Sequence, residues 1–459
     1  MIPIIDFQKR ANNGPITNMQ EFDLMLTRKA RELVKKYGLK LDINNIIATD
    51  ETADAVFNAA VEFLAEVGVY HSDTQRIIKW DKEEILAIAA DYKNNPRVLE
   101  MGKNADSMTL KQRTSKDSRP PVLWAAVPIY DQKTFGPSIE MYVQEAVIQG
   151  FSKAGGVSTI NGIESSKGTP GEIYCSLWEA EAQTEALTKA GRPDLFRGYM
   201  PTATSLGAAL ASMGPGRFEA HNCMVGIHIM PELKINWEKL NIALAFETLG
   251  ITPWTSAMSM VGGLCGGPGG AAMGAVANLL AQLSYGHGTW GSIALTEISG
   301  TAKTRGALTA YSAAHRAMER NVGLATGTPC VESAVVASHE EGIIAGTMIA
   351  IAVTASGGAL DWYGGSSPLV SRVHADVMKN VAGMEADKVN DMLQALSKKI
   401  EDIAAQTGES KLTFNEQLCG AVYNLETLKP KPEHLAAVKS SVEMMKACGV
   451  PVSDDLLLD

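Results

Sequence analysis

Hydrophobic and polar positions divide the chain into a central region of short apolar runs and two flanking regions with a helical period. Each run is followed by a turn and a longer Ala-rich segment in which apolar residues recur every three to four positions. A strand, a turn and a crossover helix make one βα unit, so the pattern predicts eight consecutive units. The runs lie at 122–129, 156–163, 197–205, 223–230, 252–261, 289–298, 323–330 and 359–363.

Eight βα units in succession are typical of a closed (β/α)8 TIM barrel, a fold of the α/β class. The competing architecture is a doubly wound open sheet. In a barrel the reacting groups gather at the C-terminal ends of the strands, so the polar residues that close each run are the candidates for chemistry. We expect the barrel to span 121–382.

The two flanks predict helical extensions. Residues 1–120 carry helical spacing over 21–37, 51–67 and 82–91, and residues 383–459 carry it over 386–407 and 433–448. The most apolar stretch, 342–360, is interrupted by Thr347, Thr354 and Ser356. It therefore predicts a buried helix followed by a strand, and not a membrane span.

Composition narrows the class of protein. Among 459 residues, 46% are hydrophobic and 20% charged, as in ordinary globular proteins. The start of the chain has no secretion signal, so we expect a cytoplasmic protein without a membrane anchor. A net charge of −10 argues against nucleic-acid partners, which require a basic face. The six cysteines are far apart and are expected to be reduced thiols.

A metal site is one candidate for the chemistry. His228 lies in the fourth run, and it could hold zinc together with Cys265 and Cys330, with Glu332 nearby in sequence. A catalytic zinc takes three such ligands from different strands and keeps one position open. The alternative is that His228 is a hydrogen-bonded barrel histidine and the cysteines are small core residues.

A glycine-rich loop at 262–270 follows the fifth run and precedes a helix. Glycines let the backbone approach a ligand, and a helix N-terminus favours negative charge. Gly263, Gly266 and Gly267 could therefore contact a carboxylate, a phosphate or a corrinoid side chain. A tight strand-to-helix connection without a ligand is the alternative.

Aromatic and polar side chains within the runs could bind a substrate. Tryptophans could hold a methylated ammonium group by cation–π attraction, or they could merely fill the core. Asp361 and Glu297 are carboxylates in apolar runs; such groups either bind a ligand or pair with a cation, here Lys303 or Arg305. The candidate substrate-binding residues are Trp124, Thr202, Thr204, Trp254, Asp361 and Trp362.

Several segments, read together and in order, resemble the monomethylamine:corrinoid methyltransferases over about residues 20–445. These barrels move a methyl group from methylamine to the Co(I) of a corrinoid protein and form homo-oligomers, so the resemblance implies a corrinoid partner and a homo-oligomer, by resemblance a hexamer. The segments are 71–80, 157–162, 189–193, 204–206, 231–235, 262–263, 304–305 and 329–332.

The resemblance also places the family's pocket residues. Its pyrrolysine, whose imine captures the amine, falls on Tyr199 or Met200, and neither side chain is an electrophile. A family glutamate and a family glutamine correspond to Ser256 and Val322. With His228 and Glu332, Tyr199, Met200 and Ser256 form the candidate catalytic set.

The leading hypothesis is therefore a pyrrolysine-independent methyltransferase that moves a methyl group from a small methylated compound, an amine first of all, to the cobalt of a corrinoid protein. One alternative is a metal-dependent barrel enzyme, with zinc, that acts on a methoxy, thioether or other small substrate. Another is a non-catalytic protein that binds a methylated osmolyte.

Overall fold

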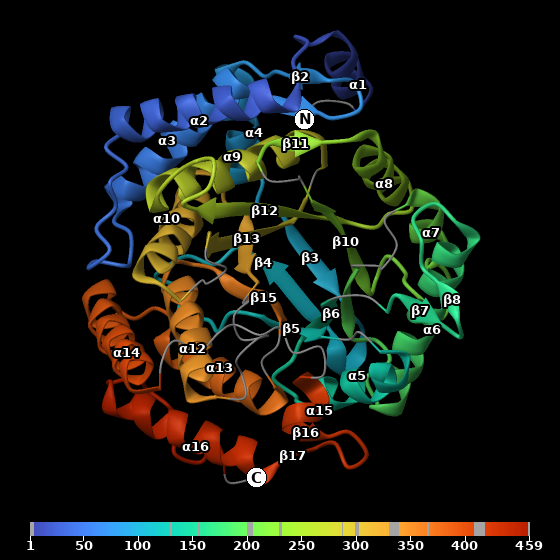
Figure 1. Cartoon of the computed structure of the whole chain (residues 1–459), viewed down its shortest axis with the longest axis vertical. Coiled ribbons are helices and arrows are strands. Elements are labelled where there is room, and N and C mark those ends of the chain that lie inside the picture. Colours follow the sequence, from blue (N-terminus) through green and yellow to red (C-terminus); the bar gives the residue numbers. More distant parts are fainter. Residues whose placement is uncertain are drawn as a thin grey trace.

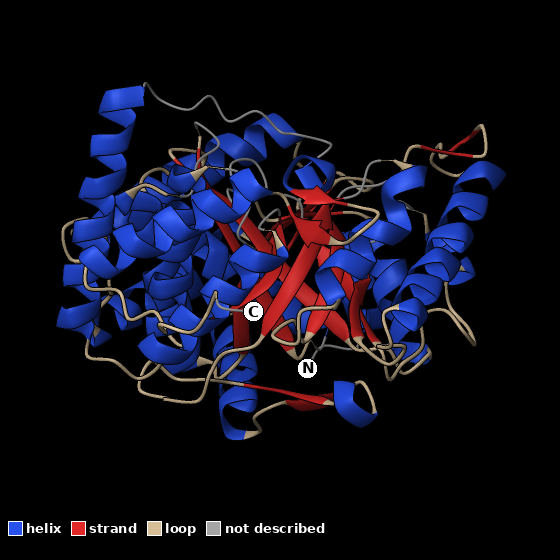
Figure 2. Ribbon diagram, turned by 90° about the horizontal axis from the view of Figure 1, so that it is seen from below, coloured by secondary structure: helices blue, strands red, loops and turns tan. Residues whose placement is uncertain are grey.

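Eight parallel strands form a closed barrel in the order β10-β12-β13-β14-β15-β5-β6-β9, which confirms the (β/α)8 prediction and rules out the open sheet. The computed structural model describes residues 4–128, 131–154, 157–199, 205–228, 232–286, 288–298, 303–329, 339–364, 367–407 and 418–457. Figures 1 and 2 show the strands inside a ring of helices. The strands are β5 (Leu123–Pro128), β6 (Gly150–Ala154), β9 (Phe196–Tyr199), β10 (Cys223–His228), β12 (Pro253–Val261), β13 (Trp290–Glu297), β14 (Ala325–Thr328) and β15 (Ala359–Gly364).

Within the described ranges, one α-helix lies between each barrel strand and the next, and the last follows β15. These helices are α5 (Phe135–Val143), α6 (Pro170–Lys189), α7 (Leu206–Ala211), α8 (Trp237–Thr248), α9 (Pro268–Gly286), α10 (Arg305–Asn321), α12 (Glu340–Ala355) and α13 (Pro368–Val381). The stretch 342–360 is thus mostly buried helix α12 followed by the start of β15, as predicted. No helix in the described part of the chain has the length and hydropathy to cross a membrane.

The second predicted strand, 156–163, was wrong. The barrel strand is β6, which lies just before it, and the predicted run instead contributes to a small hairpin of β7 (Thr159–Ile160) and β8 (Ile163–Glu164) outside the barrel. The reason is that Gly150 and Ser152 face the narrow lumen, so the true strand has a weak apolar pattern.

The N-terminal extension contains strands that the helical pattern did not predict. Its helices are α1 (Ile4–Asn13), α2 (Met19–Lys36), α3 (Asp50–Val67) and α4 (Lys82–Asn94). A three-stranded sheet joins β1 (Val69–His71) and β2 (Arg76–Ile78) to β11 (Lys234–Ile235), and β3 (Val98–Met101) pairs with β4 (Met108–Lys111) as a hairpin. The C-terminal extension holds α14 (Ala386–Thr407), α15 (Leu418–Val422), a hairpin of β16 (Tyr423–Asn424) and β17 (Lys429–Pro430), and α16 (Pro432–Ala447).

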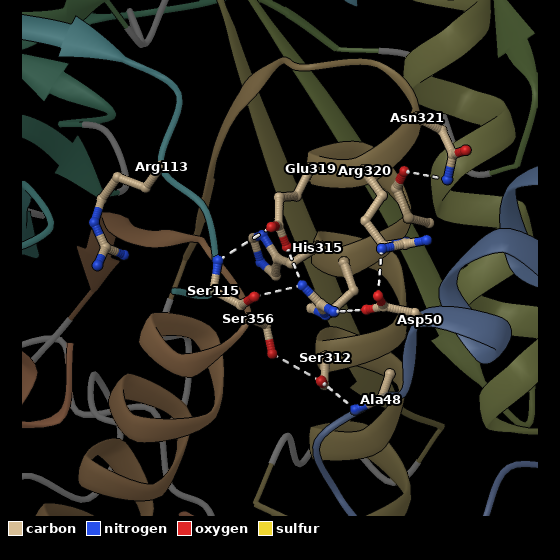
Figure 3. Close-up of polar contacts among 12 residues, drawn as sticks. Ala48, Asp50, Arg113, Ser115, Ser312, His315, Glu319, Arg320, Asn321 and Ser356 are labelled. Carbon is tan, nitrogen blue, oxygen red and sulfur yellow. Dashed lines mark hydrogen bonds and ion pairs between the residues drawn. The ribbon is translucent and has the colours of Figure 1, made fainter. Parts of the chain in front are cut away.

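The N-terminal extension packs on one side of the barrel, where α3 contacts α9 and α10. This cover explains why α9 is buried on all sides, although barrel helices usually expose one face. A polar network joins α3 to α10 (Figure 3). Arg316 donates to Asp50, to Ser115 and, at 2.6 Å, to Glu319. Arg320 donates to Asp54 at 2.8 Å.

Candidate active site

Aromatic side chains fill the N-terminal end of the barrel lumen. Trp124 lies 4.8 Å from Trp290, 6.2 Å from Trp254 and 4.6 Å from Phe196, measured between ring centroids. Each is the first or second residue of its strand. Since β5 and β12 are not neighbours in the barrel, the contact between Trp124 and Trp254 crosses the interior.

The β3–β4 hairpin covers this end of the lumen. Met101, Met108 and Leu110 of the hairpin belong to the same buried cluster as the tryptophans, and the hairpin lies within the ring of barrel strands in Figure 1. Arg192 binds Asp106 between the two hairpin strands, with 2.8 Å from Nε to Oδ1. The hairpin therefore packs over the N-terminal end of the lumen.

The position of the tryptophans favours the packing interpretation over the aromatic box. Trp124 and Trp254 are both fully buried among other rings at the end opposite to the expected active site. The side chain of Trp362 lies outside the described part of the structure. Substrate binding by Trp124 and Trp254 therefore has no support from this geometry.

Polar residues follow the aromatic layer. Because side chains alternate along a strand, a residue two positions after a lumen-facing residue faces the lumen again. Ser152 thus follows Gly150, Ser256 follows Trp254, Ser292 follows Trp290 and Asp361 follows Ala359. All four polar side chains are at most 5% exposed. We call Ser152, Ser256, Ser292 and Asp361 the polar floor of the lumen.

Asp361 is the charged member of the floor. Its Oδ2 accepts a hydrogen bond from Trp290 Nε1, and its Oδ1 accepts one from Ser292 Oγ at 3.1 Å. Burial raises the pKa of this carboxyl to about 7, although both hydrogen bonds act to lower it. Among the described side chains that face the lumen, no other carries a charge. Burial thus favours the protonated form of Asp361 more than it would for an exposed carboxyl.

Two glycines make room for the floor. A Cβ on Gly327 would lie 2.7 Å from the Asp361 carboxyl carbon and 2.5 Å from the Trp290 ring. A Cβ on Gly198 would lie 2.1 Å from Ser152 Oγ. The indoles and the polar side chains therefore fit into one narrow lumen only because these positions lack side chains.

Above the floor, the described wall on β12 is apolar. Met258 and Met260 are 41% and 39% exposed, whereas Ala257 and Val261, which alternate with them, are buried in the core cluster that includes α9. Met258 pairs in register with Ala294 of β13. The methionines therefore border the space through which a ligand reaches the floor.

Ser256 occupies the part of the floor nearest His228. The backbone register pairs His228 with Ser256 and Ser256 with Ser292. Gln282 of α9 fixes the Ser256 backbone, since its Oε1 accepts from Ser256 N at 2.9 Å and its Nε2 donates to Ser256 O at 2.6 Å. The side chain of His228 lies outside the described part, and the catalytic roles of both residues stay predictions.

Cys265 lies on the helix side of β12, away from the lumen. Its Sγ donates to Glu232 Oε2 at 3.1 Å, and Ser259 donates to the other oxygen of the same carboxylate. Burial first, and then the carboxylate, raises the pKa of the Cys265 thiol well above its usual value. The Cys265 thiol is thus engaged with Glu232, and this geometry gives no support to its predicted pairing with His228 around a metal, which stays a prediction.

No metal cluster is found within the described ranges, where no three His, Cys, Asp or Glu side chains lie close enough to hold an ion. Cys330 and Glu332 fall outside these ranges, so their predicted roles as ligand and acid are not placed. The sequence pattern did not indicate that Glu232 is a buried carboxylate. Its signal in the sequence was its position two residues after the fourth run.

The glycine loop binds its own backbone. Gly262 N donates to Gly266 O at 2.7 Å, Gly263 N to Met260 O at 2.9 Å, and Gly266 N to Gly263 O at 3.0 Å. Gly262 and Gly266 also have φ of +90° and +85°, which only glycine adopts easily. The N–H groups of Gly263 and Gly266 are therefore occupied, and the geometry favours a tight connection over the predicted cofactor contact of these two residues. The predicted contact of Gly267 stays a prediction.

A pair of substitutions in this loop tests the packing explanation. A Cβ on Gly270 would lie 1.8 Å from the carbonyl oxygen of Cys265, whereas a Cβ on Gly267 would meet nothing within 4 Å. We expect Gly270→Ala to lower the free energy of unfolding by about 1–3 kcal/mol, as overpacking does, and Gly267→Ala to leave it unchanged. Urea unfolding followed by circular dichroism measures both. Equal stability of the two variants would contradict the packing role.

Comparisons with known proteins agree with the fold over nearly the whole chain. A family model described as "Monomethylamine methyltransferase MtmB" matches residues 2–450. The chain belongs to this family. Monomethylamine methyltransferase MtmB of Methanosarcina mazei is 24% identical, and MtmB3 of Methanosarcina barkeri is also 24% identical, each over 97% of both chains. A crystal structure of the hydroxylamine MtmB complex superposes with a TM-score of 0.88 at 22% identity, covering 98% of each chain. That of the Methanosarcina barkeri enzyme superposes with a TM-score of 0.87 at the same identity and coverage.

The proposed match of Val322 to a pocket glutamine of the MtmB family was wrong. Val322 is the fully buried residue that ends α10, directly before β14. Helix-to-strand connections lie at the N-terminal end of a barrel, opposite to the pocket. Whether this chain has lost the glutamine therefore does not follow from Val322.

The remaining predicted residues of the MtmB resemblance fall at the ends of strands. Tyr199 is the last residue of β9, and its side chain is not described. Met200, Thr202 and Thr204 lie outside the described residues. The expected cation partners of the strand carboxylates are engaged elsewhere, because Lys303 pairs with Glu341 and Arg305 pairs with Glu401.

Proposed function

We propose that this protein transfers a methyl group from a small methylated amine to the cobalt of a corrinoid carried by a partner protein. Membership in the MtmB family supports this reaction class. The observation that carries the proposal in this chain is the buried Asp361 carboxyl in the floor of the barrel lumen. An amine is a cation at neutral pH, and a buried carboxylate is its natural partner.

The reaction requires positioning more than acid or base chemistry. The electron pair of Co(I) forms the new bond to the methyl carbon, and the pair of the broken carbon–nitrogen bond leaves with nitrogen. A cationic amine therefore departs as a neutral molecule, and the protein's task is to hold the donor in line with the acceptor. The hairpin and the tryptophans shield the lumen from water at its N-terminal end.

The chain performs this task without a pyrrolysine imine. The corresponding segment reads Gly-Tyr-Met-Pro at 198–201, and it contains no electrophile. We infer that charge at the floor, and not a covalent adduct, retains the amine. The partner corrinoid protein approaches the C-terminal end of the barrel, and a homo-oligomer, by resemblance a hexamer, is the expected assembly.

The test is methylation of a reduced corrinoid with a panel of donors. The purified protein is mixed with cob(I)alamin, or with the corrinoid protein encoded beside its gene, and with mono-, di-, tri- or tetramethylammonium, methanol or dimethyl sulfide. We expect loss of the Co(I) absorbance with at least one ammonium donor and none with methanol or the sulfide. Methylation by no ammonium donor with either acceptor would refute the proposal.

Zinc analysis of the same sample separates the metal-dependent alternative. That alternative predicts stoichiometric zinc together with turnover of methanol or the sulfide. Donor binding without turnover would instead indicate a non-catalytic binding protein. The amine proposal predicts turnover that a chelator does not abolish.

A further inference from the structure

The polar floor of the lumen has more hydrogen-bond acceptor positions than its internal hydrogen bonds occupy. A carboxylate has about four lone-pair positions, and Asp361 receives one hydrogen bond from Trp290 and one from Ser292. Both donors are neutral. The carboxyl therefore retains acceptor capacity and has no cation to balance its charge among the residues that the structure describes.

The strands around the lumen place no second charged group next to Asp361 in the part of the chain that the structure describes. Within the described ranges, the lumen-facing residues of these strands carry no charge and do not ionise near neutral pH. They are Ser292 and Trp290 on β13, Gly327 on β14, Trp124 on β5 and Ser152 on β6. The charge of Asp361 thus depends on burial and on whatever ligand enters the lumen.

Ser152 provides an independent sign of a ligand. Its hydroxyl is 1% exposed and has no hydrogen-bond partner. Buried polar groups are usually hydrogen-bonded, so an unpaired hydroxyl in the same polar floor as an unbalanced carboxyl points to a further group in the lumen. An ammonium ion supplies what each of them lacks, N–H donors for the hydroxyl oxygen and a positive charge for the carboxylate.

We propose, on the basis of the function proposed above, that Asp361 is the counter-ion of the amine and exchanges its own proton for the bound cation. The stoichiometry is simple: the protonated carboxyl releases one H⁺ to solvent and the ammonium ion takes its place. The N–H donors matter as well, since a quaternary ammonium cannot hydrogen-bond to Ser152. The floor therefore distinguishes methylated amines by their remaining N–H bonds.

The exchange sets a pH dependence with a definite sign. Burial raises the pKa of Asp361 to about 7, whereas an amine, like lysine, stays protonated well above this pH. Below pH 7 the ammonium must displace a proton, so its affinity falls about tenfold for each pH unit. Above pH 7 the carboxyl is already ionised and the affinity levels off.

Isothermal titration calorimetry of the full chain with methylammonium chloride, without any corrinoid, tests the exchange. Titrations at pH 6, 7 and 8 in buffers of different ionisation enthalpy give the number of protons released. We expect release of close to one proton at pH 6 and almost none at pH 8. Tetramethylammonium is expected to bind at least tenfold more weakly. Binding of methylammonium without proton release at pH 6, or no binding at any pH, would overturn the proposal.

Three variants locate the effect. Asp361→Asn keeps an acceptor oxygen for Trp290 and offers its NH2 group to the Ser292 hydroxyl, which can also accept. It is expected to bind methylammonium at least 100-fold more weakly, with no pH dependence. Ser152→Ala should weaken binding about fivefold and keep the proton release. Asp454→Asn, whose side chain is 98% exposed, is the matched control and should behave as the wild type. Wild-type affinity and proton release in Asp361→Asn would overturn the assignment.

The result of this binding experiment can be distinguished from the result of the methyl-transfer test. If proton-linked binding disappears in Asp361→Asn while the wild type methylates no corrinoid, the role of Asp361 as counter-ion is supported and the proposed methyl transfer is refuted. If the wild type methylates a corrinoid but binds amine without proton release, the proposed methyl transfer is supported and the role of Asp361 as counter-ion is refuted.

Discussion

Replacing Trp124 with alanine is expected to lower the free energy of unfolding by about 3–5 kcal/mol, the range for removing a large buried aromatic side chain. Trp124 is fully buried and contacts Trp254, Trp290 and Phe196, which come from three other strands. Its removal leaves a cavity where the barrel interior meets the β3–β4 hairpin. Chemical unfolding followed by circular dichroism measures the loss.

Trp124→Phe is the control for this cavity. It retains one ring and most of the contacts, so its loss should be less than half of that of the alanine variant. If both variants matched the wild type, the aromatic layer would not support the barrel. If only the alanine variant lost stability, the layer would act as a packed core, as its position indicates.

Replacing Arg316 with methionine is expected to lower the free energy of unfolding by about 3 kcal/mol, the low end of the range for breaking a buried ion pair. The side chains of Arg316 and Glu319 are each 9% exposed, so the variant leaves a buried carboxylate without its cation. Asp50, the other partner, is 52% exposed and regains water. The same unfolding assay reports the change.

A second substitution separates the buried charge from lost packing. Arg316→Met combined with Glu319→Gln removes both charges and should recover part of the stability, whereas a purely steric defect would persist. Lys189→Met is the matched control, because its pair with Glu185 is exposed on both sides (57% and 68%) and should contribute nothing measurable. No loss in Arg316→Met would mean that the network in Figure 3 does not hold the N-terminal extension.

The barrel could be predicted because most of its strands show their burial in sequence. β12 and β13 are long apolar runs with turns at both ends, and each overlaps its predicted range. β6 could not be found, because Gly150 and Ser152 face a crowded lumen and leave only a weak apolar signal. Short hairpins such as β3–β4 were missed for a related reason. Strands of four residues are too short for their hydrophobic period to be distinguished from that of a helix.

The site was harder to predict because sequence places a residue on a strand but not on one of its faces. Asp361 was singled out as a carboxylate in an apolar run, and it does lie in the lumen. Cys265 was singled out by residue type, yet it follows the end of β12 and turns back toward α9. Ser152 gave no signal at all, because a serine in a weak strand becomes notable only when its hydroxyl is found buried without a partner.

Aligning single residues with those of a distant family also does not tell which face of an element they occupy. At 24% identity, one misplaced gap moves a residue from a pocket to a helix end, as happened with Val322. The family assignment is robust to such errors because it rests on 2–450 as a whole. The assignment of individual pocket residues is sensitive to such errors. For these residues, the geometry of the lumen shows which side chains face the pocket.

We propose that the lumen of this barrel delivers the methyl group of an amine to cobalt, with Asp361 balancing the charge of the amine. Incubation of the protein with methylammonium labelled with carbon-13 and with a reduced corrinoid acceptor, followed by mass spectrometry of the extracted corrinoid, tests it most directly. We predict a corrinoid heavier by one labelled methyl group with the wild type, and a loss of at least 100-fold in the labelling rate with Asp361→Asn. An unlabelled corrinoid with the wild type, or equal labelling by both proteins, would contradict the claim.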